Sequence, residues 1–288
     1  MIELLPGSFN KALEARGFTA RTQKVYGYHA GTLLEYFNAP ADVLETGDVE
    51  DWIVYTRTEL GWKPNTVNSA MSAVRILFEA VGRPSVTKPI RNLRHDTPEP
   101  TVLSAEEVAA IYAAADKNTV RCAIALLYGA GLRISELLAL RFEDIDSGRS
   151  VLRIQHPKNR HARDAILPTT ALALLREQWR ERRAWTPIGL GDLVFVSRKG
   201  TALGRAVIAS ALVKCAAIAN VRKRVYPHLL RHSFATTMIE SGVDMSFVQK
   251  LLGHHSLTST GRYIHLTSAA RLGIRSPVDS ASFPIAKR

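Results

Sequence analysis

Residues 226–265 constrain the fold of this chain more than any other stretch. Pro227 suits the first turn of a helix, and the apolar residues after it recur at helical spacing. Gly242 is typical of a helix end, and Asp244 is typical of the N-cap of a second helix, which ends at Gly253. The stretch therefore predicts two short helices joined by a tight turn.

Four side chains in this stretch can do chemistry, and they stand at defined intervals: His228, Arg231, His254 and Tyr263. His228 and Arg231 lie on one helical face. Arginine is a permanently charged, bidentate partner for phosphate, histidine can move a proton near neutral pH, and tyrosine can be a nucleophile. The set suits attack of a phenol on a phosphodiester. It suits metal-dependent hydrolysis less well, because no carboxylate cluster accompanies it.

The same stretch resembles the C-terminal signature of the tyrosine recombinases, the phage-integrase family. That signature is His-x-x-Arg, then Leu-Gly-His, then a nucleophilic tyrosine nine residues later. This chain reads HLLR, LLGH and RYIH at matching intervals. The resemblance implies that His228, Arg231, His254 and Tyr263 are catalytic.

Arg133 stands among apolar residues just after a turn at Gly129 and Gly131, and a charge in such surroundings needs a partner or a ligand. From spacing alone, Glu136 is an intrahelical ion-pair partner for it. The segment GLRISEL also resembles the family's Gly-Leu-Arg-x-Ser-Glu-Leu motif. On that resemblance Arg133 is the first catalytic arginine, and Glu136 orients the site without donating a proton.

A short β region follows, with alternation over 151–155 and a β-rich run at 165–167. The turn between them is dense in cations, including Lys158 and Arg160, and should reach toward phosphates. The family carries its catalytic lysine on such a hairpin, in a Lys-Gly-x-Lys-x-Arg-x-Val-Pro pattern. Here the glycine is absent and the interval from Lys158 to Pro168 is longer than usual. Lys158 is still the best match, since no other lysine stands between Lys117 and Lys199.

The first part of the chain predicts a short helix or arm over 1–17 and helices over 19–37, 48–60 (with Asp48 as N-cap) and 62–81. This four-helix unit resembles the family's core-binding domain. Positive charge near the start of the second helix has no folding reason, because it opposes the helix dipole. A phosphate contact and ordinary solvation are both open there. The candidate DNA contacts in this unit are Arg21, Lys24 and Lys63.

Residues 84–101 contain several prolines and no periodicity, which is typical of a linker. Its Arg91 and Arg94 would follow DNA phosphates, or simply keep the linker soluble. Arg222 and Arg224 precede the signature and would face DNA or be plain surface. The basic residues of the helix over 169–183 are read as a solvated face: Arg176, Arg180, Arg182 and Arg183. A strand and turn are expected over 195–200.

The expected fold is mainly α with a small antiparallel β-sheet. It comprises a helical core-binding domain over 1–83, the linker over 84–101, and an α+β catalytic domain with a C-terminal tail over 102–288. The 288 residues are 46% hydrophobic, enough for well-formed cores.

The net charge of +12 favours a polyanionic partner, although a ribosomal or membrane-surface protein could share it. Residues 1–100 carry 11 Lys+Arg and 12 Asp+Glu, a balance of −1, whereas residues 101–288 carry 27 and 14, a balance of +13. The two cysteines form no disulfide framework. Because the start of the chain has no signal-peptide pattern and no apolar stretch is long enough for a bilayer, no membrane is expected and the location is expected to be cytoplasmic.

The family resemblance implies a site-specific DNA recombinase, or integrase, that cleaves and rejoins strands through a 3′-phosphotyrosine intermediate. It implies double-stranded DNA as substrate, no cofactor and no metal, and a homo-tetramer on two DNA sites, with a monomer or dimer off DNA. The alternatives are a type IB-like topoisomerase and a catalytically silent DNA-binding protein. A metal-dependent phosphodiesterase is the least favoured reading.

Overall fold

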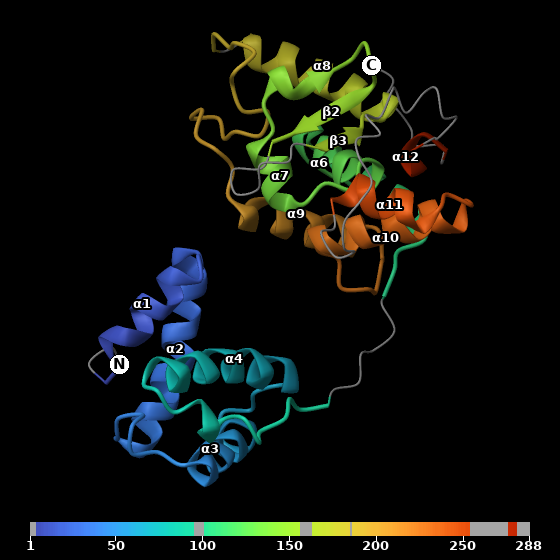
Figure 1. Cartoon of the computed structure of the whole chain (residues 1–288). Helices are drawn as coiled ribbons and strands as arrows, with labels where there is room; N and C mark the ends of the chain where they lie inside the picture. Colours follow the sequence, from blue (N-terminus) through green and yellow to red (C-terminus); the bar gives the residue numbers. More distant parts are fainter. Residues whose placement is uncertain (1–3, 95–100, 156–162, 185, 254–275, 281–288) are drawn as a thin grey trace. The chain divides into compact units, whose positions relative to one another are not determined.

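The computed structural model describes residues 4–94, 101–155, 163–184, 186–253 and 276–280. The chain divides into two compact units, Met1–Glu99 and Pro100–Arg288 (Figure 1). Each unit has its own buried apolar cluster, and the two clusters share no residue. The fold is mainly helical with one small antiparallel sheet, which confirms the predicted fold class.

The first unit is a bundle of helices wrapped around α4. Its elements are α1 (Gly7–Ala15), α2 (Ala20–Phe37), α3 (Thr46–Thr58), α4 (Pro64–Ala80) and the 3-10 helix η1 (Pro84–Val86). Helix α4 begins with proline in its first turn and buries one apolar face against α1, α2 and α3. The N-cap of α2 is Thr19, whose hydroxyl accepts a hydrogen bond from the backbone N–H of Thr22 at 3.2 Å.

The start of α3 differs from the prediction that Asp48 is its N-cap. Glu45 is the N-cap, and Asp48 stands in the first turn, where its carboxylate accepts a hydrogen bond from the backbone N–H of Glu45 at 2.7 Å. An acidic residue at this position reaches back to the cap, so the helix begins before the residue that the pattern favours.

Residues 84–94, which the proline pattern assigns to a linker, pack on the first unit. Val86 and Ile90 are buried in its core. Asn68 of α4 donates to the carbonyl of Leu93 at 3.0 Å and accepts from its N–H at 2.8 Å. Two apolar side chains and a paired backbone therefore fix a segment that has no periodicity of its own.

The second unit surrounds α6, whose residues are buried on nearly every side. Around it lie α8, α9, α10 and α12. The helices of this unit are α5 (Ala105–Ala113), α6 (Asn118–Gly129), α7 (Ile134–Ala139), η2 (Phe142–Asp144), α8 (Thr169–Arg183), α9 (Arg205–Ile218), α10 (Pro227–Glu240), α11 (Met245–Leu252) and α12 (Pro277–Ser280). None of the helices in the described ranges is long and apolar enough to span a bilayer.

The sheet has the order β1 (Ile145–Asp146), β2 (Val151–Ile154) and β3 (Arg163–Ile166), with antiparallel pairing throughout. Ile154 lies opposite Arg163 in the β2–β3 ladder. Residues 195–200 differ from the predicted strand: the structure has a single bridge there, between Val196 and Ala202.

The α10–α11 pair forms as predicted. Pro227 opens α10, and Gly242, just past its C-cap, has φ +85°. Asp244 caps α11 by accepting from the N–H of Ser246 at 2.9 Å, and Gly253 closes α11 with φ +63°.

Arg182 corrects the prediction of a fully solvated basic face on α8. Arg182 is 8% exposed, and its guanidinium donates to the carbonyl of Leu193. The guanidinium carbon lies 5.8 Å from the centroid of the Phe142 ring. An arginine near a helix end can bury its stem and stack on an aromatic face. Arg176, Arg180 and Arg183 are exposed as expected.

Helix α12 packs against α6, α8 and α10. The Ser276 hydroxyl donates to the Gly129 carbonyl at 2.6 Å, and Val278 is fully buried. Asp279 accepts from the backbone N–H groups of Thr169 and Thr170 at 2.9 and 3.1 Å, so it caps the start of α8 from across the chain.

Candidate active site

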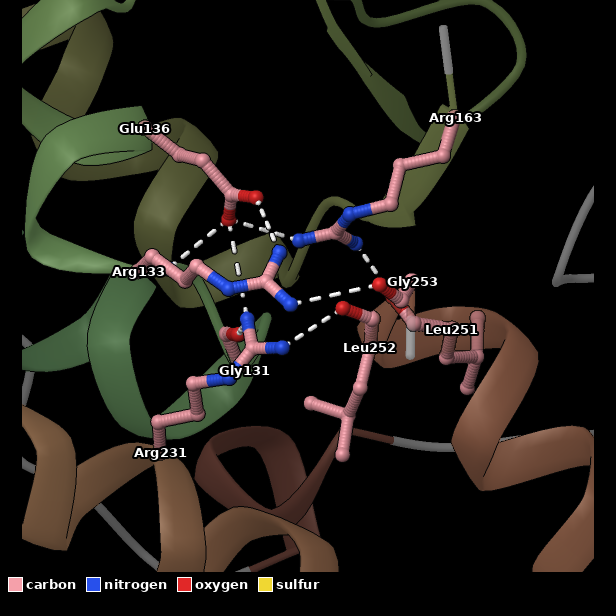
Figure 2. A network of polar contacts seen from close by, with 8 residues as sticks. All are labelled: Gly131, Arg133, Glu136, Arg163, Arg231, Leu251, Leu252 and Gly253. Atoms are coloured by element: carbon pink, nitrogen blue, oxygen red, sulfur yellow. Dashed lines mark hydrogen bonds and ion pairs between the residues drawn. The ribbon is translucent and has the colours of Figure 1, made fainter. Parts of the chain in front are cut away.

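Three arginines from three elements converge on one carboxylate (Figure 2). Arg133 is the N-cap of α7, Arg163 begins β3 and Arg231 lies in α10. The carboxylate is that of Glu136 in the first turn of α7. The local fold explains this convergence, since α7, β3, α10 and the end of α11 meet around it.

Glu136 has a side chain only 3% exposed, and its two oxygens have distinct partners. Oε1 accepts from Nη1 of Arg133 at 2.8 Å. Oε2 accepts from the backbone N–H of Arg133 at 2.8 Å and from Nη2 of Arg163 at 2.7 Å. The intrahelical pair with Arg133 that spacing predicts is therefore present, together with two further cations that spacing does not predict.

Arg231 is the most deeply buried of the three, with 3% of its side chain exposed. Its Nη1 donates to the Gly131 carbonyl and its Nη2 to the Leu252 carbonyl, both at 2.5 Å. Nη1 lies 3.6 Å from Oε2 of Glu136, which is an ion-pair distance without a hydrogen bond. Backbone carbonyls on two sides thus fix the plane of this guanidinium.

Arg133 is the most accessible arginine of the cluster, with 31% of its side chain exposed. Its Nη2 donates to the Gly253 carbonyl at 3.2 Å. A guanidinium has five N–H donors, and the contacts described use Nη1 and Nη2 once each. Arg133 can therefore offer further donors to an anion that approaches from solvent.

Two glycines let these elements approach so closely. Gly131 has φ +62°, and a Cβ there would meet the Phe234 ring at 2.6 Å. Gly253 has φ +63°, and a Cβ there would meet Cδ of Arg163 at 2.8 Å. Both positions require the left-handed backbone and the missing side chain that glycine supplies.

The electrostatics of the cluster follow from its burial and its excess of positive charge. Burial raises the pKa of Glu136, but Arg163 and Arg133 outweigh it, so its pKa is lowered and the carboxyl is ionised. Burial and the two neighbouring arginines lower the pKa of Arg231 to about 9, which leaves it charged at neutral pH. Three cations face one anion, and the surplus favours a bound anion such as phosphate.

His228 lies in the first turn of α10, is exposed, and is close enough to Arg231, His232 and Arg133 to be influenced by their charges. Partial burial, followed by the charges of these three groups, lowers its pKa. At neutral pH the imidazole is therefore neutral and can accept a proton.

The structure brings together Arg133, His228 and Arg231 of the predicted catalytic set. Lys158, Arg160, His254 and Tyr263 lie outside the described residues. The other predicted DNA contacts are all exposed: Arg21, Lys24, Lys63, Arg91, Arg94, Arg222 and Arg224. Exposure is what a phosphate contact requires, and it is also what a solvated side chain shows.

Arg163 is the site residue that the sequence analysis did not name. Its signal is a charge at the first position of a strand whose last two residues, Ala165 and Ile166, are in the core. Such a charge needs a buried counter-charge. In the part of the chain that the structure describes, no group of three His, Cys, Asp or Glu side chains could hold a metal ion. The positive surplus of the three arginines over Glu136 suits the binding of an anion.

Comparisons with known proteins find relatives that match both units of this chain. Residues 101–270 match the phage integrase family, and residues 5–86 match the family's N-terminal SAM-like domain. The chain is 30% identical to a putative integrase/recombinase, y4qK, of Sinorhizobium fredii, over 93% of this chain and 86% of that protein. It is 30% identical to the tyrosine recombinase XerA of Pyrococcus furiosus, over 90% and 88% of the two chains.

Two solved structures share the fold. One is the Tn1549 transposon integrase in complex with transposon right end DNA, with a TM-score of 0.72, 20% identity, and coverage of 88% of this chain and 94% of that chain. The other is the XerH site-specific recombinase bound to its difH substrate, with a TM-score of 0.67, 23% identity, and coverage of 87% and 80%.

Proposed function

Because this chain belongs to the phage integrase family of tyrosine site-specific recombinases, we propose that Tyr263 cleaves double-stranded DNA by forming a 3′-phosphotyrosine link. Members of the family are DNA strand-transferring enzymes, and this chain is a site-specific recombinase among them. The observation that carries the proposal is the placement of Arg133 and Arg231 on the same carboxylate, next to the end of α11. His254 of the signature follows that end directly.

Arg133 and Arg231 hold the non-bridging oxygens of the scissile phosphate and stabilise the charge of the transition state. The exposed fraction of Arg133 supports direct contact with the phosphate. Arg231 is held by the carbonyls of Gly131 and Leu252, which supports a preorganised donor. Fixed donors cost no reorganisation when the reaction takes place.

The proton transfers follow from the remaining residues. The Tyr263 oxygen attacks phosphorus, its proton passes to neutral His228, and the bond from phosphorus to the 5′-oxygen breaks. Lys158 gives a proton to that leaving oxygen, and His254 hydrogen-bonds a phosphate oxygen. Attack by a 5′-hydroxyl on the phosphotyrosine reverses these steps, so the energy of the phosphodiester is kept and no cofactor is needed.

Strand exchange requires two DNA sites, and we place a homo-tetramer on them. The solved relatives support DNA as the partner, since the Tn1549 integrase and XerH are described in complexes with DNA. The exposed cations of both units would follow its phosphates. Because its substrate is DNA, the enzyme would act in the cytoplasm.

Two other activities fit the same site. A type IB-like topoisomerase would use the same residues and reseal without a partner site. A silent DNA-binding protein would keep the cations without the reaction, but the network around Glu136 supports an intact site.

The test uses sheared genomic DNA of the source organism. The protein is incubated with it, the reaction is stopped with SDS, and covalent adducts are captured and their DNA ends sequenced, with Tyr263→Phe as the control. Adducts at one repeated sequence, lost in Tyr263→Phe while DNA is still bound, are expected. Adducts at scattered sequences would indicate a topoisomerase. Bound DNA without adducts would indicate a silent binding protein.

A further inference from the structure

Arg163 has no part in the mechanism above, although it contacts the same carboxylate as the other two arginines. Only 10% of its side chain is exposed, against 31% for Arg133. Its Nη2 is bonded to Glu136 and its Nη1 to the carbonyl of Leu251 (Figure 2). Arg163 is therefore bound to protein groups on two sides, and the proposed mechanism gives it no phosphate contact.

The contact with Glu136 matters because a carboxylate competes with phosphate for arginine. An ionised carboxylate binds a guanidinium through two parallel hydrogen bonds when both of its oxygens are available. Here Arg163 bonds Oε2, and Arg133 has a single side-chain bond, to Oε1. Arg231 stays 3.6 Å from Oε2 and directs its hydrogen bonds to backbone carbonyls instead.

We propose that Arg163 is a positioning residue that neutralises Glu136, so that this carboxylate orients Arg133 and Arg231 without capturing the donors that a DNA phosphate needs. The inference rests on the proposed function, in which those two arginines hold the scissile phosphate. Without Arg163, Glu136 would draw the other two guanidiniums inward, and the cluster would lose one of its three positive charges.

A second contact ties Arg163 to the end of α11. It bonds the Leu251 carbonyl, and its Cδ would lie 2.8 Å from a Cβ at Gly253, so a side chain there would displace it. Arg133 bonds the carbonyl of Gly253 itself. Arg163 therefore joins β3 to α7, through Glu136, and to the end of α11, through Leu251.

The test is a double-mutant cycle between Arg163 and Glu136, read as the rate of SDS-resistant adduct formation on sheared genomic DNA of the source organism. The variants are Arg163→Met, Arg163→Lys, Glu136→Gln and Arg163→Met/Glu136→Gln. Arg153→Met on the neighbouring strand is the matched control, since it removes an arginine that pairs with Asp146 at the surface. Filter binding before SDS measures DNA affinity, and thermal unfolding confirms that each variant is folded.

Arg163→Met is expected to slow adduct formation about 100-fold, because small misplacements of charge-stabilising groups have effects of that order. DNA affinity should change less than about threefold, since most of the binding comes from other phosphate contacts. Arg163→Lys restores a charge beside Glu136 and should recover most of the rate. In the Glu136→Gln background, Arg163→Met should slow adduct formation by less than about threefold, because no carboxylate remains to be neutralised.

Equal losses in both backgrounds would overturn the proposal, because Arg163 would then act independently of Glu136. A rate for Arg163→Met within threefold of the Arg153→Met rate would overturn it as well. Tyr263→Phe separates this failure from failure of the proposed function. Adducts that persist in Tyr263→Phe would reassign the nucleophile, while the Arg163–Glu136 cycle would remain readable on the same adducts.

Discussion

At the scale of single residues, Glu136 contributes both to the stability of the second unit and to the geometry of the candidate site. Its buried carboxylate contacts Arg133, Arg163 and Arg231, two of which are themselves nearly buried. Removing one partner from a buried ion-pair network lowers the free energy of unfolding by more than the intact network adds to it, because the remaining charges are left uncompensated. The fold of the second unit should therefore depend on this side chain.

Glu136→Gln is expected to lower the free energy of unfolding by about 3–5 kcal/mol at neutral pH. Urea unfolding of the variant and of the wild type measures the difference. Glu143→Gln, at an exposed position in η2, serves as the control and should stay within about 0.5 kcal/mol of the wild type. A similar cost for both variants would contradict the role given to the cluster.

The pH dependence of that difference has a definite sign. Because the pKa of Glu136 is lowered in the folded state, its stabilising effect is fully present above the unfolded value of 4.5. It is lost as the pH falls from 4.5 through the folded pKa. The difference in free energy of unfolding between wild type and Glu136→Gln should thus be constant near neutrality and shrink only in acid. Urea titrations at a series of pH values measure this difference.

At the scale of elements, the ends of α10 and α11 offer a natural comparison. Gly242 and Gly253 each follow the last turn of a helix, and both have a positive φ. A Cβ at Gly242 would meet nothing within 4 Å, whereas a Cβ at Gly253 would meet Arg163 at 2.8 Å. Gly242→Ala should cost about 1 kcal/mol for the left-handed backbone alone.

Gly253→Ala should lower the free energy of unfolding by roughly 1–3 kcal/mol more than Gly242→Ala does, which is the usual penalty of overpacking. It should also slow adduct formation. Urea unfolding and the adduct assay test the two effects side by side. Identical behaviour of the two alanine variants would show that the close approach of α11 to Arg163 is unimportant.

The elements show where sequence reasoning succeeds and where it stops. Helix ends with a local chemical cause were predictable: Asp244 caps α11, and Gly253 ends it. Asp48 was misassigned because one carboxylate can cap from two positions, and the pattern does not distinguish them. Arg182 was misassigned because its partners, Leu193 and Phe142, come from other segments.

The candidate site divides in the same way. Arg133, His228 and Arg231 were predictable because each stands in a compact motif with a fixed internal spacing. Arg163 was not predictable, because its role depends on contacts with Glu136 and Leu251, which are far from it in the sequence. A buried ion-pair network is a property of tertiary structure, and only its individual charges are visible in the sequence.

At the scale of the whole molecule, charge is distributed very unevenly. The first 100 residues have a balance of −1 and the rest a balance of +13. The two units have separate cores, so each is expected to fold as a separate fragment. The second unit should account for most of the electrostatic attraction to DNA.

We expect a fragment of residues 100–288 to bind duplex DNA with a steep salt dependence, since each phosphate contact contributes a slope of about −0.9 to log K against log salt. The fragment 1–99 should show a shallower slope. Fluorescence anisotropy with one labelled duplex over a range of salt concentrations measures both. A steeper slope for 1–99 would mean that its exposed cations outweigh its net charge.

The docking of α12 has a kinetic consequence for Tyr263, the proposed nucleophile. Gly253 is bound by Arg133, and Ser276 is bound to Gly129, so the described residues on either side of Tyr263 in the sequence are held by one body. A reactive group on a chain anchored at both ends has an effective concentration near its target that is set by the length of the loop and not by the amount of protein in solution. If Tyr263 is the nucleophile, as proposed, loss of the Ser276 contact is expected to lower its effective concentration at Arg133 and Arg231 without changing those arginines.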